Sequence, residues 1–313
     1  MRPTVSVIIP THDRPDLLGE ALHSIALQDC DLAAVEVIIV NNGRMDVAPQ
    51  ARRASEHFTV RVHTLPGPVG PAVARNVGME DSRGDHIAFL DDDDVYLPGH
   101  LRVALGALEA GDIQAAYTNC LVTSTRVDPT RPVTGALRSL DHPYSREFLA
   151  VCPHIAVHCA VYRSFRDTGA RFDAAFGGVD DWEVQLRLAY EHGYRLRYVD
   201  EPTVVYHRFA PEASLTGQIA RDAATQARWV RLIWRVWKRW PARDGRTTRY
   251  RRHLMEGVLL ALKREGGRPQ SLSYYDRCVR QLAAAWHGLE PEEGLVERLA
   301  GAATGVTDAA PLL

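Results

Sequence analysis

The first 110 residues of this chain alternate between short apolar runs and amphipathic segments. The apolar runs lie at residues 5–10, 35–40, 60–65 and 86–90. Val and Ile dominate the first two, which is typical of parallel strands buried on both faces. Segments with apolar residues at helical spacing lie at residues 16–28, 47–57, 72–81 and 101–108. This repeat predicts an α/β fold with an open, mostly parallel sheet flanked by helices.

Beyond residue 110 the pattern becomes mixed and finally helical. Strands are predicted at residues 113–119, 121–127, 157–162, 195–199 and 203–208. A stretch with several prolines at 128–142 shows little periodicity and indicates a long surface loop. From about residue 211 helical spacing predominates, with helices expected at 213–240, 247–263, 272–287 and 291–300. We therefore expect a first domain at 1–210 and a helical C-terminal region at 211–313.

Polar residues gather directly after three of the predicted strands. His12 follows the first strand, Asn41 the second, and the run Asp91–Asp94 the fourth. Open α/β sheets bind their ligands outside the carboxyl ends of the strands. Agreement between three separate strand ends predicts one ligand site at this edge of the sheet.

The run Asp91–Asp94 is the strongest chemical signal in the sequence. Four adjacent carboxylates repel one another, and burying even one of them unpaired is costly. Mg²⁺ and Mn²⁺ bind carboxylate oxygens and bridge to phosphates, so a divalent cation would offset this repulsion. An isolated acidic run is more often a solvated turn or the start of a helix. Because polar residues also follow the first and second predicted strands, at His12 and Asn41, we favour the cation site over a solvated turn.

A second acidic pair, Asp180–Asp181, follows two glycines and precedes Trp182 at the start of a predicted helix. An Asp at this position is usually only a helix cap. Trp182 is open to two interpretations, a platform for a bound acceptor or a residue of the core.

These motifs, in this order, resemble the N-terminal half of family-2 glycosyltransferases. The resemblance extends over about residues 4–210 and rests on VSVIIPTHDR at 5–14, NNG at 41–43, ARNVG at 74–78 and FLDDDD at 89–94. It implies the Rossmann-like GT-A fold, with residues 1–210 as a catalytic domain that binds a nucleotide-diphosphate sugar.

By this resemblance the nucleotide and diphosphate are contacted by Pro10, Thr11, His12, Arg14, Arg75 and Asn76. Asn41 stands where the family usually carries an Asp that binds the base, often uracil, so a UDP-type donor is favoured. An amide donates as well as accepts hydrogen bonds, which leaves the nucleotide open. Arg75 has a plainer alternative as a helix-surface ion pair.

The resemblance also implies a metal site and a catalytic base. Asp93 is expected to bind Mn²⁺ or Mg²⁺ directly, Asp91 to lie near the ribose and the metal's waters, and Asp92 to be the variable middle position. His207 is expected to be a further metal ligand, or else a surface histidine in a turn. Asp181 is the expected general base, and a single carboxylate opposite the leaving group suits inversion. Asp180 would contact the acceptor or orient Asp181.

Composition narrows the setting. The net charge of −2 gives no general attraction to nucleic acid. The five cysteines are scattered without a CxxC pair, so we expect buried thiols in a reducing cytoplasm and neither a disulfide framework nor a zinc site. No signal peptide or membrane-spanning segment is expected.

Residues 229–240 are expected to carry Trp and apolar residues on one helical face and Arg and Lys on the other. Such a helix packs on the first domain or in a homodimer, or it lies on an anionic membrane. We expect an inverting, metal-dependent glycosyltransferase acting on a small molecule such as a bacterial natural product, including antibiotics. The alternatives are a transferase for envelope or lipid-linked glycans at the membrane surface, and a nucleotide-sugar-binding protein without turnover.

Overall fold

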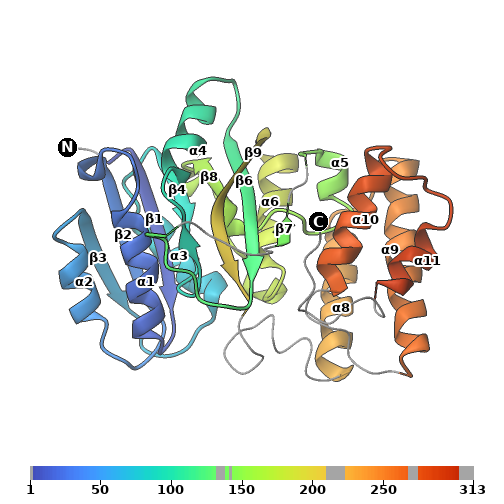
Figure 1. Ribbon diagram of the computed structural model, residues 1–313, viewed down its shortest axis with the longest axis horizontal. Coiled ribbons are helices and arrows are strands. Elements are labelled where there is room, and N and C mark those ends of the chain that lie inside the picture. Colours follow the sequence, from blue (N-terminus) through green and yellow to red (C-terminus); the bar gives the residue numbers. More distant parts are fainter. Residues whose placement is uncertain (1–2, 132–137, 141–142, 209–222, 267–273, 303–313) are drawn as a thin grey trace.

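The computed structural model describes residues 3–131, 138–140, 143–208, 223–266 and 274–302 (Figure 1). Its strands are β1 Val5–Thr11, β2 Val35–Asn41, β3 Thr59–Thr64, β4 His86–Phe89, β5 Val95–Tyr96, β6 Ala115–Thr123, β7 Arg138–Leu140, β8 Ala160–Arg163 and β9 Leu196–His207. Its α-helices are α1 Pro15–Ala26, α2 Ala48–Ala54, α3 Pro71–Asp81, α4 His100–Glu109, α5 Arg146–Leu149, α6 Asp180–Glu191, α8 Ala223–Arg239, α9 Gly245–Arg264, α10 Tyr274–Trp286 and α11 Leu295–Gly301.

The strands form one mixed, mostly parallel sheet in the order β3-β2-β1-β4-β8-β6-β9-β5, with β7 paired to β6. The pairs β1–β2, β1–β4, β2–β3 and β6–β9 are parallel, whereas β8 runs antiparallel to both β4 and β6. The predicted fold class is confirmed. Because β2 and β4 lie on opposite sides of β1, the chain reverses its winding direction there. The carboxyl ends of β1 and β4 therefore border the crevice where such sheets bind ligands.

Two predicted strand boundaries are wrong. The strands expected at 113–119 and 121–127 are one strand, β6 at Ala115–Thr123, and those expected at 195–199 and 203–208 are one strand, β9 at Leu196–His207. The two strands pair along their length, and a register shift at Asn119 absorbs the irregular positions. Long-range pairing thus carries the strand through residues that look like a break locally.

A glycine lets helix α3 approach the sheet closely. A Cβ at Gly78 would lie 2.5 Å from Cγ2 of Ile8 in β1, which no side chain tolerates without a shift of the backbone. This contact brings the N-terminal half of α3, with Arg75, to the carboxyl end of β1.

The C-terminal helices pack beside α5 and α6 at one end of the molecule (Figure 1). Ile233, Val236, Trp237 and Trp240 of α8 are buried. The indole N–H of Trp237 donates to the carbonyl of Val151 at 3.0 Å. The apolar face of residues 229–240 is thus largely covered by the first domain, as the packing alternative expects. The expected boundary at 210/211 lies outside the described residues.

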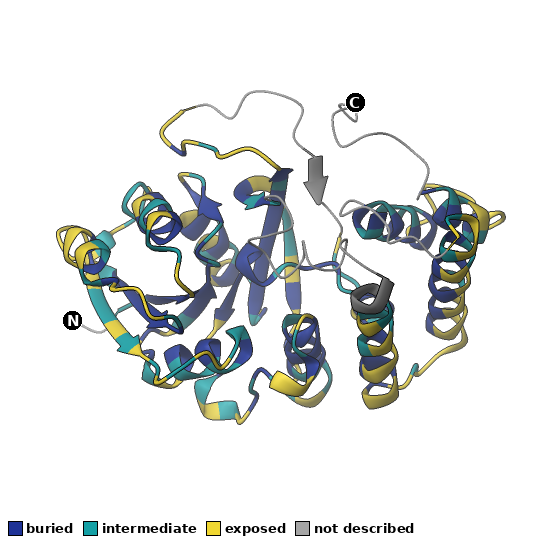
Figure 2. Ribbon diagram, turned by 90° about the horizontal axis from the view of Figure 1, so that it is seen from below, coloured by how far each residue is buried: buried dark blue, intermediate teal, exposed yellow. Residues whose placement is uncertain are grey.

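The opposite face of α8 is exposed and basic (Figure 2). Within the described ranges, every helix is too short or too polar to span a bilayer.

Candidate functional site

A cavity of about 580 Å³ lies between the strand ends and the C-terminal helices, within the usual size range of ligand pockets. The sequence-predicted residues that line it are Pro10, Thr11, His12, Arg14, Arg75, Asp91, Asp92, Asp93, Asp180, Asp181 and His207. Residues from β1, α3, the turn after β4, α6 and β9 therefore meet around one space.

Two arginines neutralise the acidic turn after β4. Arg75 donates to Asp91 at 2.7 Å. Arg14 contacts Asp92 at 2.7 Å and Asp93 at 2.8 Å. The Thr11 hydroxyl donates to the second oxygen of Asp92 at 2.7 Å. These contacts hold three adjacent carboxylates in fixed positions at the floor of the cavity.

The carboxylates fit a hard divalent cation. Burial raises the pKa of Asp92 to about 7 and also raises that of Asp93. Burial acts in the same direction on Asp91, but the contacts of Arg75 and His158 together outweigh it and lower the pKa of Asp91. The side chains of Asp91 and Asp93 keep 30% and 14% of their surface exposed, and both line the cavity. Asp91 is thus held ionised, whereas the charged form of Asp93 is disfavoured until a cation offsets it. Carboxylate oxygens that face the cavity in this way are suited to Mg²⁺ or Mn²⁺.

Asp94 anchors the turn from below. It is 1% exposed and accepts the backbone N–H of His207 at 2.8 Å. Its other oxygen lies 3.0 Å from Nδ1 of His158, a residue that sequence reasoning missed. Although burial disfavours a charged ring, the Asp94 carboxylate raises the pKa of His158.

The ring of His207 has partners on both sides. Its Nδ1 donates to the carbonyl of Asp93 at 2.7 Å, and its Nε2 accepts the backbone N–H of Val127 at 3.2 Å. Burial lowers its pKa to about 4, so the ring is neutral. Metal binding at Nε2 would require the loss of the Val127 contact.

Arg75 also reaches the acidic pair at the start of α6. Its Nη1 lies 3.2 Å from Oδ2 of Asp180, and Asp180 accepts the backbone N–H of Gly178 at 3.1 Å. The surface-ion-pair alternative for Arg75 is wrong, because this side chain is 7% exposed and bridges two carboxylates. Burial and the neighbouring Asp180 raise the pKa of Asp181 to about 6.

Three sequence-predicted residues lie outside the cavity lining. Asn41 folds its own loop, accepting the N–H of Gly43 and donating to the carbonyl of Met45. Asn76 exchanges two hydrogen bonds with the backbone of Phe172, at 2.8 and 2.9 Å. Trp182 is fully buried and donates its indole N–H to the carbonyl of Leu149, so the core alternative describes it.

The cavity is also lined by residues that were not predicted to be site residues. Asn42, one position beyond the predicted base contact, lines the cavity and accepts the N–H of Val69 at 2.7 Å. The C-terminal helices contribute mostly apolar groups and one carboxylate: Trp229, Leu254, Tyr275, Asp276 and Val279. Their approach to the strand ends depends on tertiary packing and has no local sequence signal.

Comparison with known proteins agrees with this geometry. The family described as Glycosyl transferase family 2 matches residues 6–170, which is more than half of the chain. The chain belongs to this family. It is therefore a glycosyltransferase that uses a nucleotide-sugar donor.

Individual relatives add detail. The uncharacterized glycosyltransferase YwdF of Bacillus subtilis is 30% identical over 203 residues, covering 64% of this chain and 73% of that protein. The GalNAc(5)-diNAcBac-PP-undecaprenol beta-1,3-glucosyltransferase of Campylobacter jejuni is 29% identical over 123 residues, covering 38% and 39%.

The fold also matches solved structures. The mannosyltransferase PcManGT of Pyrobaculum calidifontis, solved with GDP-Man and Mn²⁺, superposes with a TM-score of 0.53 at 20% identity, covering 97% of this chain and 87% of that one. At this identity the likeness shows the GT-A-like fold.

Proposed function

We propose that this glycosyltransferase moves a sugar, with inversion, from a UDP-type donor to a lipid-linked or envelope glycan at a membrane surface. The observation that carries the catalytic part is the arrangement around Arg75. This one buried side chain contacts Asp91 on the cation side of the cavity and Asp180 beside the proposed base. The two halves of a displacement reaction are thereby held at a fixed spacing.

Asp91 and Asp93 would hold the divalent cation, with Asp92 kept in place by Thr11 and Arg14. When bound, such a cation neutralises the charge that develops on the diphosphate leaving group. Pro10, His12 and Asn42 would border the nucleotide, and His207 would support the turn through the carbonyl of Asp93 rather than bind the cation itself.

Asp181 would accept the proton of the acceptor hydroxyl or amine as that atom attacks the anomeric carbon. A pKa of about 6 leaves it mostly ionised at neutral pH and still basic enough to take a proton. Asp180, tied to Arg75 and to the N–H of Gly178, would orient the start of α6. Asp181 lines the same cavity as Asp91 and Asp93, and a carboxylate available as a base there favours turnover over nucleotide-sugar binding alone.

Two observations support an acceptor at a membrane. The Campylobacter relative is named for an undecaprenol-linked acceptor. The exposed face of α8 carries Arg228, Arg231 and Lys238, with Trp234 54% exposed among them. Basic residues around an exposed Trp suit an anionic bilayer surface, at about 1 kcal/mol for each basic residue.

A small-molecule acceptor is the second candidate. The observation in its favour is the mostly apolar wall formed by Trp229, Leu254 and Val279, which could hold an aglycone. No relative described above carries a name that supports natural-product or antibiotic biosynthesis, so we rank this candidate below the first.

The test combines transfer and vesicle flotation. Radiolabelled UDP- and GDP-sugars are offered with Mn²⁺ to lipid-linked and to soluble acceptors, and Asp181→Asn is compared with wild type. Loss of transfer with unchanged donor binding is expected, and equal rates would exclude Asp181 as the base.

Flotation on anionic vesicles tests whether the protein binds the membrane surface where a lipid-linked acceptor would lie. We expect wild type to float and the double variant Arg231→Glu/Lys238→Glu to stay in the soluble fraction. The charge-matched control Arg52→Glu/Arg53→Glu, on the exposed side of α2, should float like wild type. If the wild-type protein does not bind anionic vesicles and glycosylates a soluble acceptor, the small-molecule acceptor is favoured.

A further inference from the structure

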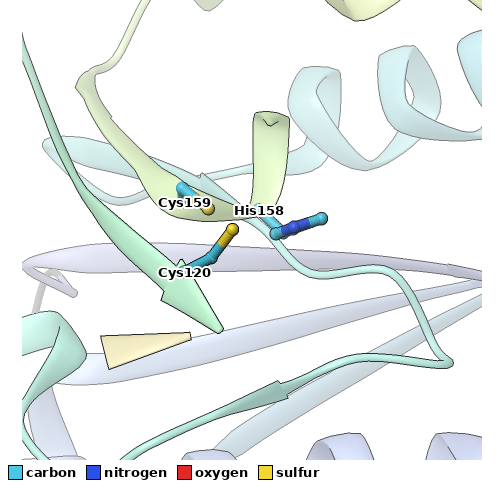
Figure 3. Close-up of side chains that lie close together, drawn as sticks. All are labelled: Cys120, His158 and Cys159. Carbon is cyan, nitrogen blue, oxygen red and sulfur yellow. The ribbon is translucent and has the colours of Figure 1, made fainter. Parts of the chain in front are cut away.

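A second group of metal-binding side chains lies behind the acidic turn. Cys120 in β6, together with His158 and Cys159 in the short 3-10 helix Val157–Cys159 before β8, offers two sulfur atoms and a ring nitrogen within 4.8 Å of one another. Figure 3 shows the two sulfur atoms approaching each other with the ring of His158 beside them. The three residues meet because β6 and β8 are antiparallel neighbours in the sheet.

The cluster is buried and incompletely satisfied. Cys120 is 1% exposed, and His158 and Cys159 are each 3% exposed. Nδ1 of His158 lies 3.0 Å from Oδ2 of Asp94, and within the described residues Nε2 has no hydrogen-bond partner. A buried polar atom without a hydrogen bond is costly, and each one in a native protein calls for a physical reason. A bound metal ion would provide one.

We propose that Cys120, His158 and Cys159 bind a soft divalent transition metal, for which Zn²⁺ is the best match. Two thiolates and an imidazole are a common zinc-binding set, and sulfur ligands select against the hard cations that suit Asp91 and Asp93. The molecule would then carry two metal sites of different chemistry, one on each side of the acidic turn. This proposal is independent of the proposed acceptor and of the proposed catalytic base.

The surroundings support metal binding. Asp94 lies beside the ring, with Oδ2 3.0 Å from Nδ1 of His158. A carboxylate next to a metal-bound histidine is common, because it fixes the orientation of the ring.

The site has a structural consequence for catalysis. Asp94 holds the turn that carries Asp91 and Asp93, and it also accepts the N–H of His207. A metal that clamps His158 to Cys120 would therefore stiffen the floor of the donor site. The proposal departs from the expectation of no zinc site because its ligands come from β6 and from the 3-10 helix before β8, which are distant in sequence.

The test is metal content. The full-length protein is purified under reducing conditions, incubated with Zn²⁺ at about pH 8, where competition from protons is weaker than at neutral pH, and dialysed against Zn²⁺-free buffer with excess Mg²⁺. Elemental mass spectrometry should find about one zinc per chain in wild type. Replacement by Co²⁺ should give a thiolate-to-metal absorption band in the near ultraviolet.

Variants assign the site. Cys120→Ser and Cys159→Ser should retain less than about a fifth of the wild-type zinc, since each loses one of three ligands. Cys278→Ser removes another buried thiol and should retain all of it. Asp93→Asn should retain zinc while losing Mn²⁺-dependent nucleotide binding, which separates the two sites.

Three results would overturn the proposal. The first is a wild-type chain without zinc after loading, a measurement that does not depend on how any variant folds. The second is equal zinc retention in Cys120→Ser and Cys278→Ser, with circular dichroism confirming that both are folded. The third is a Cys120–Cys159 disulfide in the purified protein, seen by mass spectrometry without reduction.

Discussion

The two walls of the cavity differ in chemistry and in origin. The donor wall is charged, and its carboxylates Asp91, Asp92 and Asp93 each contact an arginine. The acceptor wall is mostly apolar and comes from α8, α9 and α10, with the carboxylate of Asp276 paired to Arg208 at 2.8 Å. On the proposed function the donor wall would bind the phosphate-bearing donor, and the acceptor wall, whose shape depends on how the helices pack, would bind the acceptor.

This difference predicts which substitutions should affect catalysis most. Changes at the donor wall and at the base should affect every acceptor alike, because all acceptors share the same displacement. Changes at the acceptor wall should alter acceptor affinity and leave donor chemistry intact. The following predictions test this separation from the largest effect to the smallest.

The largest effect is expected from Asp181→Asn. Loss of a positioned general base typically lowers the rate by about 10²–10⁴. The substitution keeps the size of the side chain and should leave donor binding unchanged, since Arg14 and Arg75 do not depend on Asp181. Steady-state transfer and isothermal titration with UDP and Mn²⁺ measure the two quantities. Asp167→Asn, with its side chain 87% exposed, is the control and should behave as wild type.

Arg75→Met should be the next most severe change, and it acts on stability. It leaves Asp91 and the buried Asp180 without the positively charged guanidinium of Arg75, and breaking a buried ion pair typically costs about 3–5 kcal/mol. Urea unfolding without divalent cations measures this loss. The exposed pair Arg102–Asp29 provides the contrast, because Arg102→Met should cost less than about 1 kcal/mol. A loss at Arg75 no larger than that at Arg102 would mean that Arg75 does not hold the two halves of the site together.

The same contrast explains how much of the site could be predicted. Asp91, Arg14 and Asp181 follow strands or lie at the start of a helix in recognisable local motifs, so their roles could be predicted from the sequence. His158 and Asp276 contact the site only through sheet pairing and helix packing, which leave no local pattern. The prediction named Asn41, but Asn42 lines the cavity, because neighbouring side chains at the end of a strand point in opposite directions. The strand break predicted near residue 120 failed for a related reason, since pairing with β9 overrides local irregularity.

At the acceptor wall, Trp229→Ala should raise the KM for acceptor about tenfold, as expected when a large contact surface is removed. Donor hydrolysis in the absence of acceptor should keep its wild-type rate, because Trp229 lies on α8, away from the carboxylates of the turn. Steady-state transfer gives the KM for acceptor, and donor hydrolysis is measured separately without acceptor. If the hydrolysis rate falls as the KM rises, the donor and acceptor walls are coupled and their separation is not valid.

The smallest effect is a pH dependence near neutrality. Burial and Asp180 raise the pKa of Asp181 to about 6, so the base is protonated below that pH and ionised above it. At saturating donor and acceptor, kcat should fall about twofold between pH 7 and pH 6, and about fivefold more between pH 6 and pH 5. An ordinary Asp, with a pKa of about 3.9, would give almost no decline between pH 7 and pH 5. Asp92→Asn serves as the control for the second raised carboxyl: a decline that disappears in this variant would move the titration from the base to the donor wall.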